Sequence, residues 1–455
     1  MNEISAYLQK HQARHLEELK ELLRIPSVST SKENEADVRR AAQWLVDELD
    51  RLGFDTEMRE TARHPVVYAE NLDAGPDAPT VLVYGHYDVQ PPDPLDLWTT
   101  GPFDPTVRDE KLYARGATDD KGQMFTHIKA AEAHLSVNGS LPVNLKLLIE
   151  GEEEIGSPNL APYVTEHREE LAADMVVISD TSMFAPGLPA IVYGLRGLTY
   201  FEVECKGPSH DLHSGLYGGS VANPINALCH IIASLKDEGG RITVPGFYDD
   251  VRPLTEVERE EWAALPFDEE AFRAGCGASV MSGEEGYTTL ERRWGRPTLD
   301  CNGVWGGFTG QGAKTVLPSK ATAKFSCRLV PDQDFKDIEA KMAEHLQTLA
   351  PEGIEVEVRC LHGGEPVIID ISGEGVQAAR KALSETFGKD AVLIRSGGSI
   401  PVVSDFSKIL KIPVVMMGFG LPDDRLHSPD EKIDLACYFG GIQASAAFLS
   451  ICSEK

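Results

Sequence analysis

The chain has 455 residues, of which 42% are hydrophobic and 25% are charged. This composition is typical of a globular protein, and the length favours two domains over a single small core. The formal net charge of -29 at pH 7 argues against nucleic acid and anionic membranes as partners, because both would repel the chain. The best candidate for a membrane span, residues 409–421, is interrupted by Lys411 and Pro413, so none is expected.

The cysteines and the N-terminal stretch bear on the cellular compartment. The eight cysteines all follow residue 200 and are irregularly spaced. This usage predicts reduced thiols in a cytoplasmic protein, and neither a disulfide framework nor a sulfur-ligated zinc site. The N-terminal stretch predicts a helix and not a signal peptide, because leucines recur at helical spacing among charges up to Pro26.

The first 190 residues alternate between helix and strand patterns. An amphipathic helix is expected at 34–52, where Gly53 would end it. Strands are expected at 65–70, 80–85, 143–149 and 175–179, with a helix between the second and the third. Strands joined through helices predict a mostly parallel sheet covered on both faces, which binds ligands at the carboxyl ends of its strands.

The pattern changes between residues 192 and 364. Half-buried strands are expected at 198–205 and 322–330 and a helix at 222–235, whereas 245–300 is acidic and irregular. Helix and strand patterns alternate again from residue 373 onwards. We therefore expect a discontinuous α/β domain, formed by 1–191 and 365–455, and an inserted α+β domain at 192–364.

Polar residues follow each predicted strand of the main domain. His86 and Asp88 follow the strand at 80–85, and their spacing lets Asp88 hold one imidazole nitrogen while the other binds a metal. Further carboxylates follow in RGATDDKG (115–122), EGEEEIGS (150–157) and VISDT (177–181), and His427 lies in a loop near the C-terminus. Each motif alone reads as a surface turn. Together they predict a nitrogen and oxygen site for two divalent metals that share a bridging group.

These motifs, taken in their order along the chain, resemble those of the carnosinase-like dipeptidases, also called cytosolic nonspecific dipeptidases. That family belongs to a clan of two-metal amidohydrolases with acetylornithine deacetylase, succinyl-diaminopimelate desuccinylase and carboxypeptidase G. The resemblance covers essentially the whole chain. It implies that the main domain is a zinc-peptidase catalytic domain and that the inserted domain serves as a lid and dimerisation domain.

The resemblance also implies the metal ligands. Asp119 would bridge both metals, His86 and Asp180 would complete one site, and Glu154 and His427 would complete the other. Two metal ions per subunit are expected, with Zn²⁺ as the first choice and Mn²⁺ or Co²⁺ as alternatives.

Two more catalytic roles and one backbone feature follow from the resemblance. Glu153 would be the general base that takes a proton from a metal-bridging water, and Asp88 would be the partner of His86. A cis peptide bond is expected between Asp119 and Asp120. No role follows for Glu152, which is expected either to be exposed or to help neutralise the site.

The inserted domain carries three of the remaining candidates, His213, Thr315 and Arg328, and the main domain carries Ser399. The resemblance implies that His213 reaches the active site of a partner subunit and stabilises the oxyanion, which requires a homodimer formed through the inserted domains. Arg328 is a candidate for binding the terminal carboxylate of a substrate, since a guanidinium fork fits that group. Thr315 and Ser399 are further candidate substrate contacts.

The expected activity is metal-dependent hydrolysis of dipeptides or short peptides. The first alternative is a deacylase or desuccinylase of N-acyl amino acids from the same clan, with the same catalytic groups and a different pocket. A catalytically inactive binding relative is the remaining alternative. The intact general base and the complete ligand set argue against it.

Overall fold

The computed structural model describes residues 2–398 and 400–454, and it divides into two compact units. Unit 1 comprises Met1–Tyr193, Ile369–Ile394 and Pro401–Lys455, and unit 2 comprises Gly194–Ile368 and Arg395–Ile400. The chain passes between the units in β8 (Ala190–Leu195), β15 (Val367–Ile368) and β16 (Val392–Ser396), which form a three-stranded sheet. Unit 2 is thus an insertion into the sequence of unit 1.

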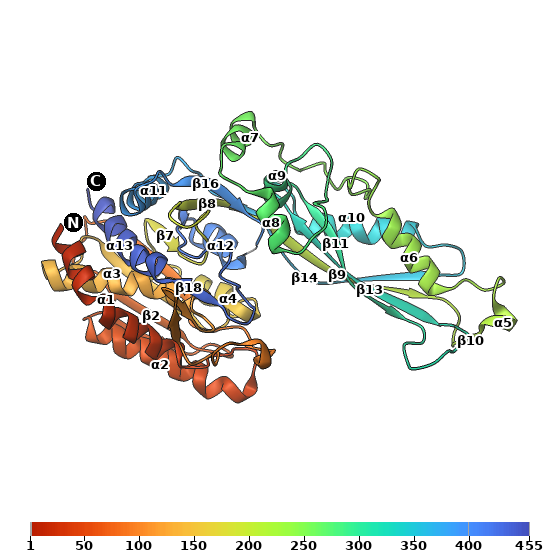
Figure 1. The fold of residues 1–455 in the computed structure, drawn as a ribbon, viewed down its shortest axis with the longest axis horizontal. Helices are drawn as coiled ribbons and strands as arrows, with labels where there is room; N and C mark the ends of the chain where they lie inside the picture. The colour runs from red at the N-terminus through yellow and green to blue at the C-terminus, as the bar shows by residue number, and fades with distance from the viewer. Residues whose placement is uncertain (1, 399, 455) are drawn as a thin grey trace. The chain divides into compact units, whose positions relative to one another are not determined.

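A six-stranded sheet forms the centre of unit 1 (Figure 1). Its spatial order is β1 (Asp55–Arg59), β2 (Val66–Asn71), β6 (Asn144–Glu150), β3 (Thr80–His86), β7 (Met175–Ile178) and β17 (Val414–Met416). The four strands from β6 to β17 are parallel, while β1 and β2 are antiparallel additions at one edge. The parallel strands end at the same edge of the sheet, so the residues that follow them are brought together.

Helices cover both faces of this sheet, which confirms the predicted α/β architecture. The α-helices of unit 1 are α1 (Asn2–Leu23), α2 (Glu35–Arg51), α3 (Lys121–Asn138), α4 (Leu160–Glu166), α11 (Glu374–Phe387), α12 (Pro401–Asp405) and α13 (Leu435–Cys452). Short turns of other helix types are η1 (Lys32–Asn34), η2 (Leu95–Leu97), η3 (Glu153–Ile155) and η4 (Phe406–Leu410). Val81 and Val83 of β3 join the core formed with α1, α2, α3, α11 and α13. On the other face, Tyr84 packs edge-on against Phe406 of η4.

The sequence accounts for the shape of α2 and for the apolar character of α13. In α2, Val38, Leu45 and Leu49 lie on one fully buried stripe, and the helix is followed by Gly53 with a φ of 85°. Among the described residues, α13 is the helix that is long and apolar enough to span a membrane. It packs against α3 and α11, and 61% of it is buried, so a place in the core explains its composition.

A second, small sheet connects the C-terminal segment to the polar loop that precedes α3. It consists of β4 (Thr106–Arg108), β5 (Lys111–Tyr113) and β18 (Lys432–Asp434) in the order β18-β5-β4. Ile433 of β18 lies opposite Leu112 of β5. Residues just before β18 are therefore held beside residues just after β5.

Unit 2 is built on a four-stranded antiparallel sheet. Its order is β11 (Thr298–Gly306), β13 (Lys320–Leu329), β9 (Gly197–Lys206) and β14 (Glu355–Gly364). One face packs against α6 (Pro224–Ser234) and α10 (Phe335–Thr348), and Phe201, Val203 and Phe325 lie in this core. The other face is half-buried, so β9 alternates between buried and partly exposed residues as its sequence predicts. A two-stranded sheet, β10 (Leu212–His213) with β12 (Val316–Leu317), and the short helix α5 (Ser214–Tyr217) complete this part of the unit.

The acidic segment at 245–300 is more regular than the sequence indicated. It contains α7 (Glu256–Ala263), α8 (Glu269–Gly275) and α9 (Thr289–Trp294). Two of these helices begin with a capping box, Thr255 with Glu258 and Thr288 with Glu291, in which each side chain satisfies a free backbone N–H group. The expectation of an irregular segment is wrong at these helices because their local caps compensate for short length and high charge.

A buried ion-pair cluster joins α1, α2 and α3. The ammonium of Lys129 lies 2.6 Å from Glu18 and 2.9 Å from Glu132 and also pairs with Glu48. Arg14 and Arg51 bind the same glutamates. These three carboxylates could by themselves hold a metal ion. Three cationic side chains already bind them, so the cluster is structural.

Replacing Glu132 with Gln should lower the free energy of unfolding by about 3 kcal/mol at pH 7, because Lys129 loses a buried partner. Burial alone would raise the pKa of Glu132, but hydrogen bonds from His15 and Arg14 and the charge of Lys129 lower it. A carboxyl with a lowered pKa stabilises the folded chain above its unfolded pKa, near 4.5, and this stabilisation is lost as the pH falls. The difference between wild type and variant should therefore shrink below about pH 4.5 in urea unfolding experiments.

Glu17→Gln is the matched control, since Glu17 pairs with Lys20 on the same helix but its side chain is 60% exposed. Its effect should stay below about 0.5 kcal/mol at either pH. Equal effects of the two substitutions would contradict the structural role of the cluster.

Candidate metal centre and active site

The loop at 115–120 places two aspartates at the start of α3. Gly122 N donates a hydrogen bond to Gly116 O, and a Cβ atom on Gly122 would lie 1.8 Å from the carbonyl oxygen of Ala117. Only glycine allows this close return of the backbone. The predicted cis peptide bond between Asp119 and Asp120 is confirmed.

The structure brings the predicted metal ligands of unit 1 together in two groups. His86, Asp119 and Asp180 form the first, and Asp119, Glu154 and His427 form the second. Within each group the ligand atoms lie within 4.8 Å of one another. Asp119 belongs to both groups, which is the arrangement that a bridging carboxylate requires.

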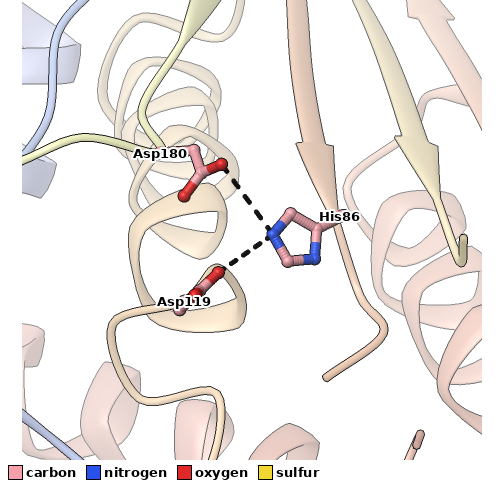
Figure 2. Close-up of side chains that lie close together, drawn as sticks. All are labelled: His86, Asp119 and Asp180. Atoms are coloured by element: carbon pink, nitrogen blue, oxygen red, sulfur yellow. Dashed lines mark ion pairs between the residues drawn. The ribbon is translucent and has the colours of Figure 1, made fainter. Parts of the chain in front are cut away.

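In the first group the imidazole of His86, at the end of β3, faces two carboxylates (Figure 2). Its Nε2 atom lies 3.2 Å from Oδ1 of Asp119 and 4.0 Å from Oδ2 of Asp180. His86 is fully buried, and its Nε2 has no hydrogen-bond partner among the described residues. A buried ring nitrogen beside two carboxylates fits a divalent cation of the zinc type.

In the second group His427 approaches the other oxygen of Asp119. The Nε2 atom of His427 lies 2.9 Å from Oδ2 of Asp119 and 3.4 Å from Oε2 of Glu154. The side chain of His427 is 55% exposed, in contrast to the buried His86. One group is thus enclosed and the other is open to solvent, and both offer one imidazole and two carboxylates.

Asp88 holds the turn that carries two of the three consecutive glutamates. Its Oδ1 atom accepts a hydrogen bond from Glu153 N at 3.2 Å, and its Oδ2 atom accepts one from Glu154 N at 3.1 Å. The Nδ1 atom of His86 lies 3.1 Å from the backbone oxygen of Asp88 and 3.4 Å from Oδ1. Asp88 is fully buried; its backbone oxygen orients the histidine, and its carboxylate holds the glutamate turn.

The carboxylates of the site repel one another strongly. Burial and the charge of Asp119 raise the pKa of Glu153 to about 7 and that of Glu154 to about 8. The same two causes raise the pKa of Asp180 well above its usual value. Burial also opposes the charge of Asp119, but hydrogen bonds with His427 and His86 outweigh it and lower the pKa of Asp119. Divalent cations at this position would compensate the negative charge and keep these groups ionised.

The remaining acids of EGEEEIGS have structural partners. Glu152 is only 2% exposed, and it accepts hydrogen bonds from Thr61 Oγ1, His64 N and Asn159 Nδ2. The alternative of an exposed Glu152 is therefore wrong, because the side chain joins two loops. Glu150 accepts hydrogen bonds from Tyr84 at 2.6 Å and Ser157 at 2.8 Å, and burial raises its pKa to about 8.

Two polar residues at the site were not found by sequence reasoning. Gln90 donates a hydrogen bond from Nε2 to Oε2 of Glu154 at 2.8 Å. Glu431 is fully buried and accepts hydrogen bonds from Gly116 N, Thr118 N and Asp119 N at 3.0–3.1 Å. It also accepts one from Nη1 of Arg115 at 2.6 Å. The sequence offers no spacing that would connect Glu431 to a loop so distant in the chain.

His213 and Arg328 lie on two different strands of unit 2. His213 ends β10 opposite Val316 of β12, is exposed, and accepts a hydrogen bond at Nδ1 from Gly215 N. The backbone oxygen of Thr315 accepts a hydrogen bond from Ser214 N, so the structure brings Thr315 and His213 close together. Arg328 lies on β13, and Ser399 lies outside the described residues. The roles of these four residues remain predictions.

Residues 82–450 match the peptidase family M20/M25/M40, and the chain belongs to this family. It is 36% identical to the Cys-Gly metallodipeptidase DUG1 of Candida albicans, over 95% of this chain and 93% of that protein. It is 35% identical to the Beta-Ala-His dipeptidase of Homo sapiens, over 98% of this chain and 92% of that protein. The chain is therefore a peptidase, and the resemblance found in its motifs is confirmed.

A solved structure supports the same family assignment. The M20 family metallo-carboxypeptidase Sso-CP2 from Sulfolobus solfataricus aligns with a TM-score of 0.86 at 35% identity. The alignment covers 97% of this chain and 99% of that chain. The similarity thus extends over both units and is not confined to the metal-binding motifs.

The buried pair of Arg115 and Glu431 generates a stability prediction. Glu431→Gln should lower the free energy of unfolding by about 3–5 kcal/mol, because Arg115 is left in the interior without its carboxylate. The double variant Arg115→Met/Glu431→Gln should recover part of this loss, since no unpaired charge stays buried. Urea unfolding of the single and double variants measures the coupling. Additive losses would show that the pair does not act as a unit.

Proposed function

We propose that this chain is a dipeptidase that uses two divalent metal ions to hydrolyse the peptide bond of dipeptides or short peptides. The observation that supports it most directly is the sharing of Asp119 by two groups of one histidine and two carboxylates. Sequence relatives named as metallodipeptidase and dipeptidase, each covering more than nine-tenths of this chain, support the same substrate class.

His86, Asp119 and Asp180 would hold one ion, and Asp119, Glu154 and His427 would hold the other. When bound, the two ions supply Lewis-acid polarisation of the scissile carbonyl and lower the pKa of the attacking water. Imidazole and carboxylate ligands without thiolates suit Zn²⁺ first, and Mn²⁺ or Co²⁺ as alternatives.

Glu153 would act as the general base. It belongs to neither ligand group, lies beside both, and its backbone is fixed by Asp88. A carboxylate in this position can take the proton from the attacking water and deliver it to the nitrogen of the leaving amine. Because Glu153 is not part of either ligand group, its charge remains available for that transfer.

Residues of unit 2 would complete substrate recognition. Arg328 would bind the terminal carboxylate of the substrate, Thr315 and Ser399 would be further substrate contacts, and His213 would stabilise the oxyanion. His213 lies on the small sheet of β10 and β12, Thr315 directly precedes β12, and both residues are exposed, which supports a shared role.

We also propose that the chain forms a homodimer through unit 2, with His213 acting in the active site of the partner subunit. Unit 2 exposes large apolar side chains, among them Leu216 (76% exposed), Val304 (51%) and Trp305 (46%). Val304 and Trp305 lie on β11, an edge strand of the four-stranded sheet. Exposed apolar residues on and near a sheet edge are typical of surfaces that another chain covers.

A reducing, cytoplasmic environment is part of the proposal. All eight cysteines are free, and Cys205, Cys327, Cys437 and Cys452 are buried as thiols. This usage is typical of compartments that keep thiols reduced.

The proposed function predicts how Glu153→Gln should behave on Ala-Ala. With Zn²⁺ or Mn²⁺ added, kcat should fall by about 10²–10⁴-fold, because the proton acceptor is lost. The variant should still bind two metal ions per chain, measured by metal analysis after gel filtration. Near wild-type turnover with unchanged metal content would show that another group is the base, and a maximum of one ion would contradict the bridging role of Asp119.

N-acetyl-alanine in the same assay separates the dipeptidase from the deacylase of the same clan. The wild type should favour Ala-Ala in kcat/KM. A preference for N-acetyl-alanine would support the deacylase alternative, and hydrolysis of neither compound would support an inactive binding relative.

The dimer proposal predicts that two inactive variants restore each other. Chains with His213→Ala and chains with Glu153→Gln, refolded together, should regain up to about one quarter of wild-type activity, because half of the sites in mixed dimers are intact. Each variant refolded alone is the control. No recovery, with mixed dimers demonstrated by differently tagged chains, would place His213 outside the partner's site.

A further inference from the structure

Three arginines of unit 2 gather at one end of its four-stranded sheet. Arg328 of β13 lies opposite Leu198 of β9 and opposite Thr298 of β11. Arg196 precedes Leu198 by two residues, and the alternation of buried and partly exposed residues along β9 indicates that both belong to the same, half-exposed face. Arg293 belongs to α9, which leads into β11.

A pair of glycines lets the guanidinium of Arg196 lie close to the backbone of Arg293. A Cβ atom on Gly397 would lie 2.8 Å from Nη2 of Arg196 and 3.2 Å from the backbone oxygen of Arg293. Arg196 donates hydrogen bonds from Nε to Gly397 O at 3.1 Å and from its backbone nitrogen to Gly398 O at 3.2 Å. These contacts fix Arg196 in one place.

Arg293 is oriented by an aromatic ring. Its guanidinium carbon lies 4.7 Å from the ring centre of Phe272, and the residue as a whole is exposed. The guanidinium therefore has a fixed direction while the residue remains open to solvent and to a ligand.

The charges of this cluster act on one another. Burial, followed by the charges of Arg328 and Arg293, lowers the pKa of Arg196 to about 10. Burial lowers the pKa of Arg328 as well. The negative charge of Asp300 acts to raise the pKa of Arg196, but Asp300 is exposed and its carboxylate also lies 3.6 Å from the ammonium of Lys236. In a chain with a net charge of -29, this concentration of positive charge would be stabilised by an anionic ligand.

We propose that Arg196, Arg293 and Arg328 form one anion subsite that favours substrates whose C-terminal residue has an acidic side chain. This inference rests on the proposed function, in which Arg328 binds the terminal carboxylate. The terminal carboxylate carries one negative charge, whereas the three guanidinium groups carry three positive charges. The side-chain carboxylate of a C-terminal glutamate or aspartate supplies a second negative charge, for which Arg196 and Arg293 are the partners.

Competition between Ala-Glu and Ala-Gln tests the subsite, because these dipeptides differ in charge and hardly in size. The wild type should show a kcat/KM for Ala-Glu about tenfold above that for Ala-Gln at low salt. The ratio should fall as salt is raised from about 0.05 M to 0.5 M, because the shorter Debye length weakens the attraction. Arg293→Gln should reduce this ratio of kcat/KM values to about two. Arg293→Lys should give a ratio between those of Arg293→Gln and the wild type, since lysine keeps the positive charge but lacks the two-pronged guanidinium group.

Arg359→Gln is the matched control. Arg359 lies on β14 of the same sheet, is exposed, and pairs with Glu357 at 2.7 Å, outside the cluster. The ratio of kcat/KM for Ala-Glu to that for Ala-Gln should be the same in Arg359→Gln as in the wild type. A wild-type ratio of one or less, or a ratio unchanged by Arg293→Gln, would overturn the subsite even though hydrolysis of both dipeptides would uphold the proposed function. Hydrolysis of neither dipeptide would instead count against the proposed function itself.

Discussion

The burial of several carboxylates around Asp119 is the constraint on which the rest of unit 1 depends. In an interior of low polarity such groups repel one another, so they stay together only if the backbone on either side is held firmly. Asp88 holds the Glu153 turn through two backbone N–H groups, and Glu431 holds the Asp119 loop through three. The carboxylates of the proposed metal ligands are thus held by two other carboxylates, Asp88 and Glu431, which bind backbone N–H groups, and Glu431 also pairs with Arg115.

The same constraint explains why the C-terminal segment before β18 lies against the loop before α3, which is distant in sequence. The segment before β18 meets the loop before α3 through Thr118, whose Oγ1 atom donates a hydrogen bond to Lys432 O at 2.7 Å. Gln123 adds a second connection, since its Oε1 atom accepts from Phe419 N at 2.6 Å and its Nε2 atom donates to Thr118 O at 3.0 Å. His427 can approach Asp119 because these contacts fix both ends of its loop. A large insertion between the two halves of unit 1 is tolerated because the halves are joined within the sheet and by these loops.

The sequence predicted the elements whose patterns are local. The strand at 80–85 is observed at Thr80–His86, and the helix at 34–52 is observed at Glu35–Arg51, because apolar spacing and the glycine stop act within a few residues. The neighbouring positions of His86, Asp180 and the glutamates at 152–154 followed from the rule that parallel strands end at one edge, whereas the choice of Glu154 and the roles of Asp119 and His427 rested on the family resemblance. The burial of Glu152 and the role of Glu431 could not be predicted. Their partners, such as His64 and Thr118, lie far away in sequence, and no spacing rule connects them.

Unit 1 and unit 2 concentrate charges of opposite sign. A free dipeptide carries an ammonium group at one end and a carboxylate at the other. Unit 1 concentrates carboxylates, such as Glu153 and Asp180, which the proposed metal ions would neutralise, whereas unit 2 concentrates the guanidinium groups of Arg196, Arg293 and Arg328, which in the proposed function would bind a carboxylate. Because the two sets of charges lie in separately folded units, each set keeps its own electrostatic environment. The net charge of -29 reflects the acidic character of most of the surface and describes neither the carboxylates of unit 1 nor the arginines of unit 2.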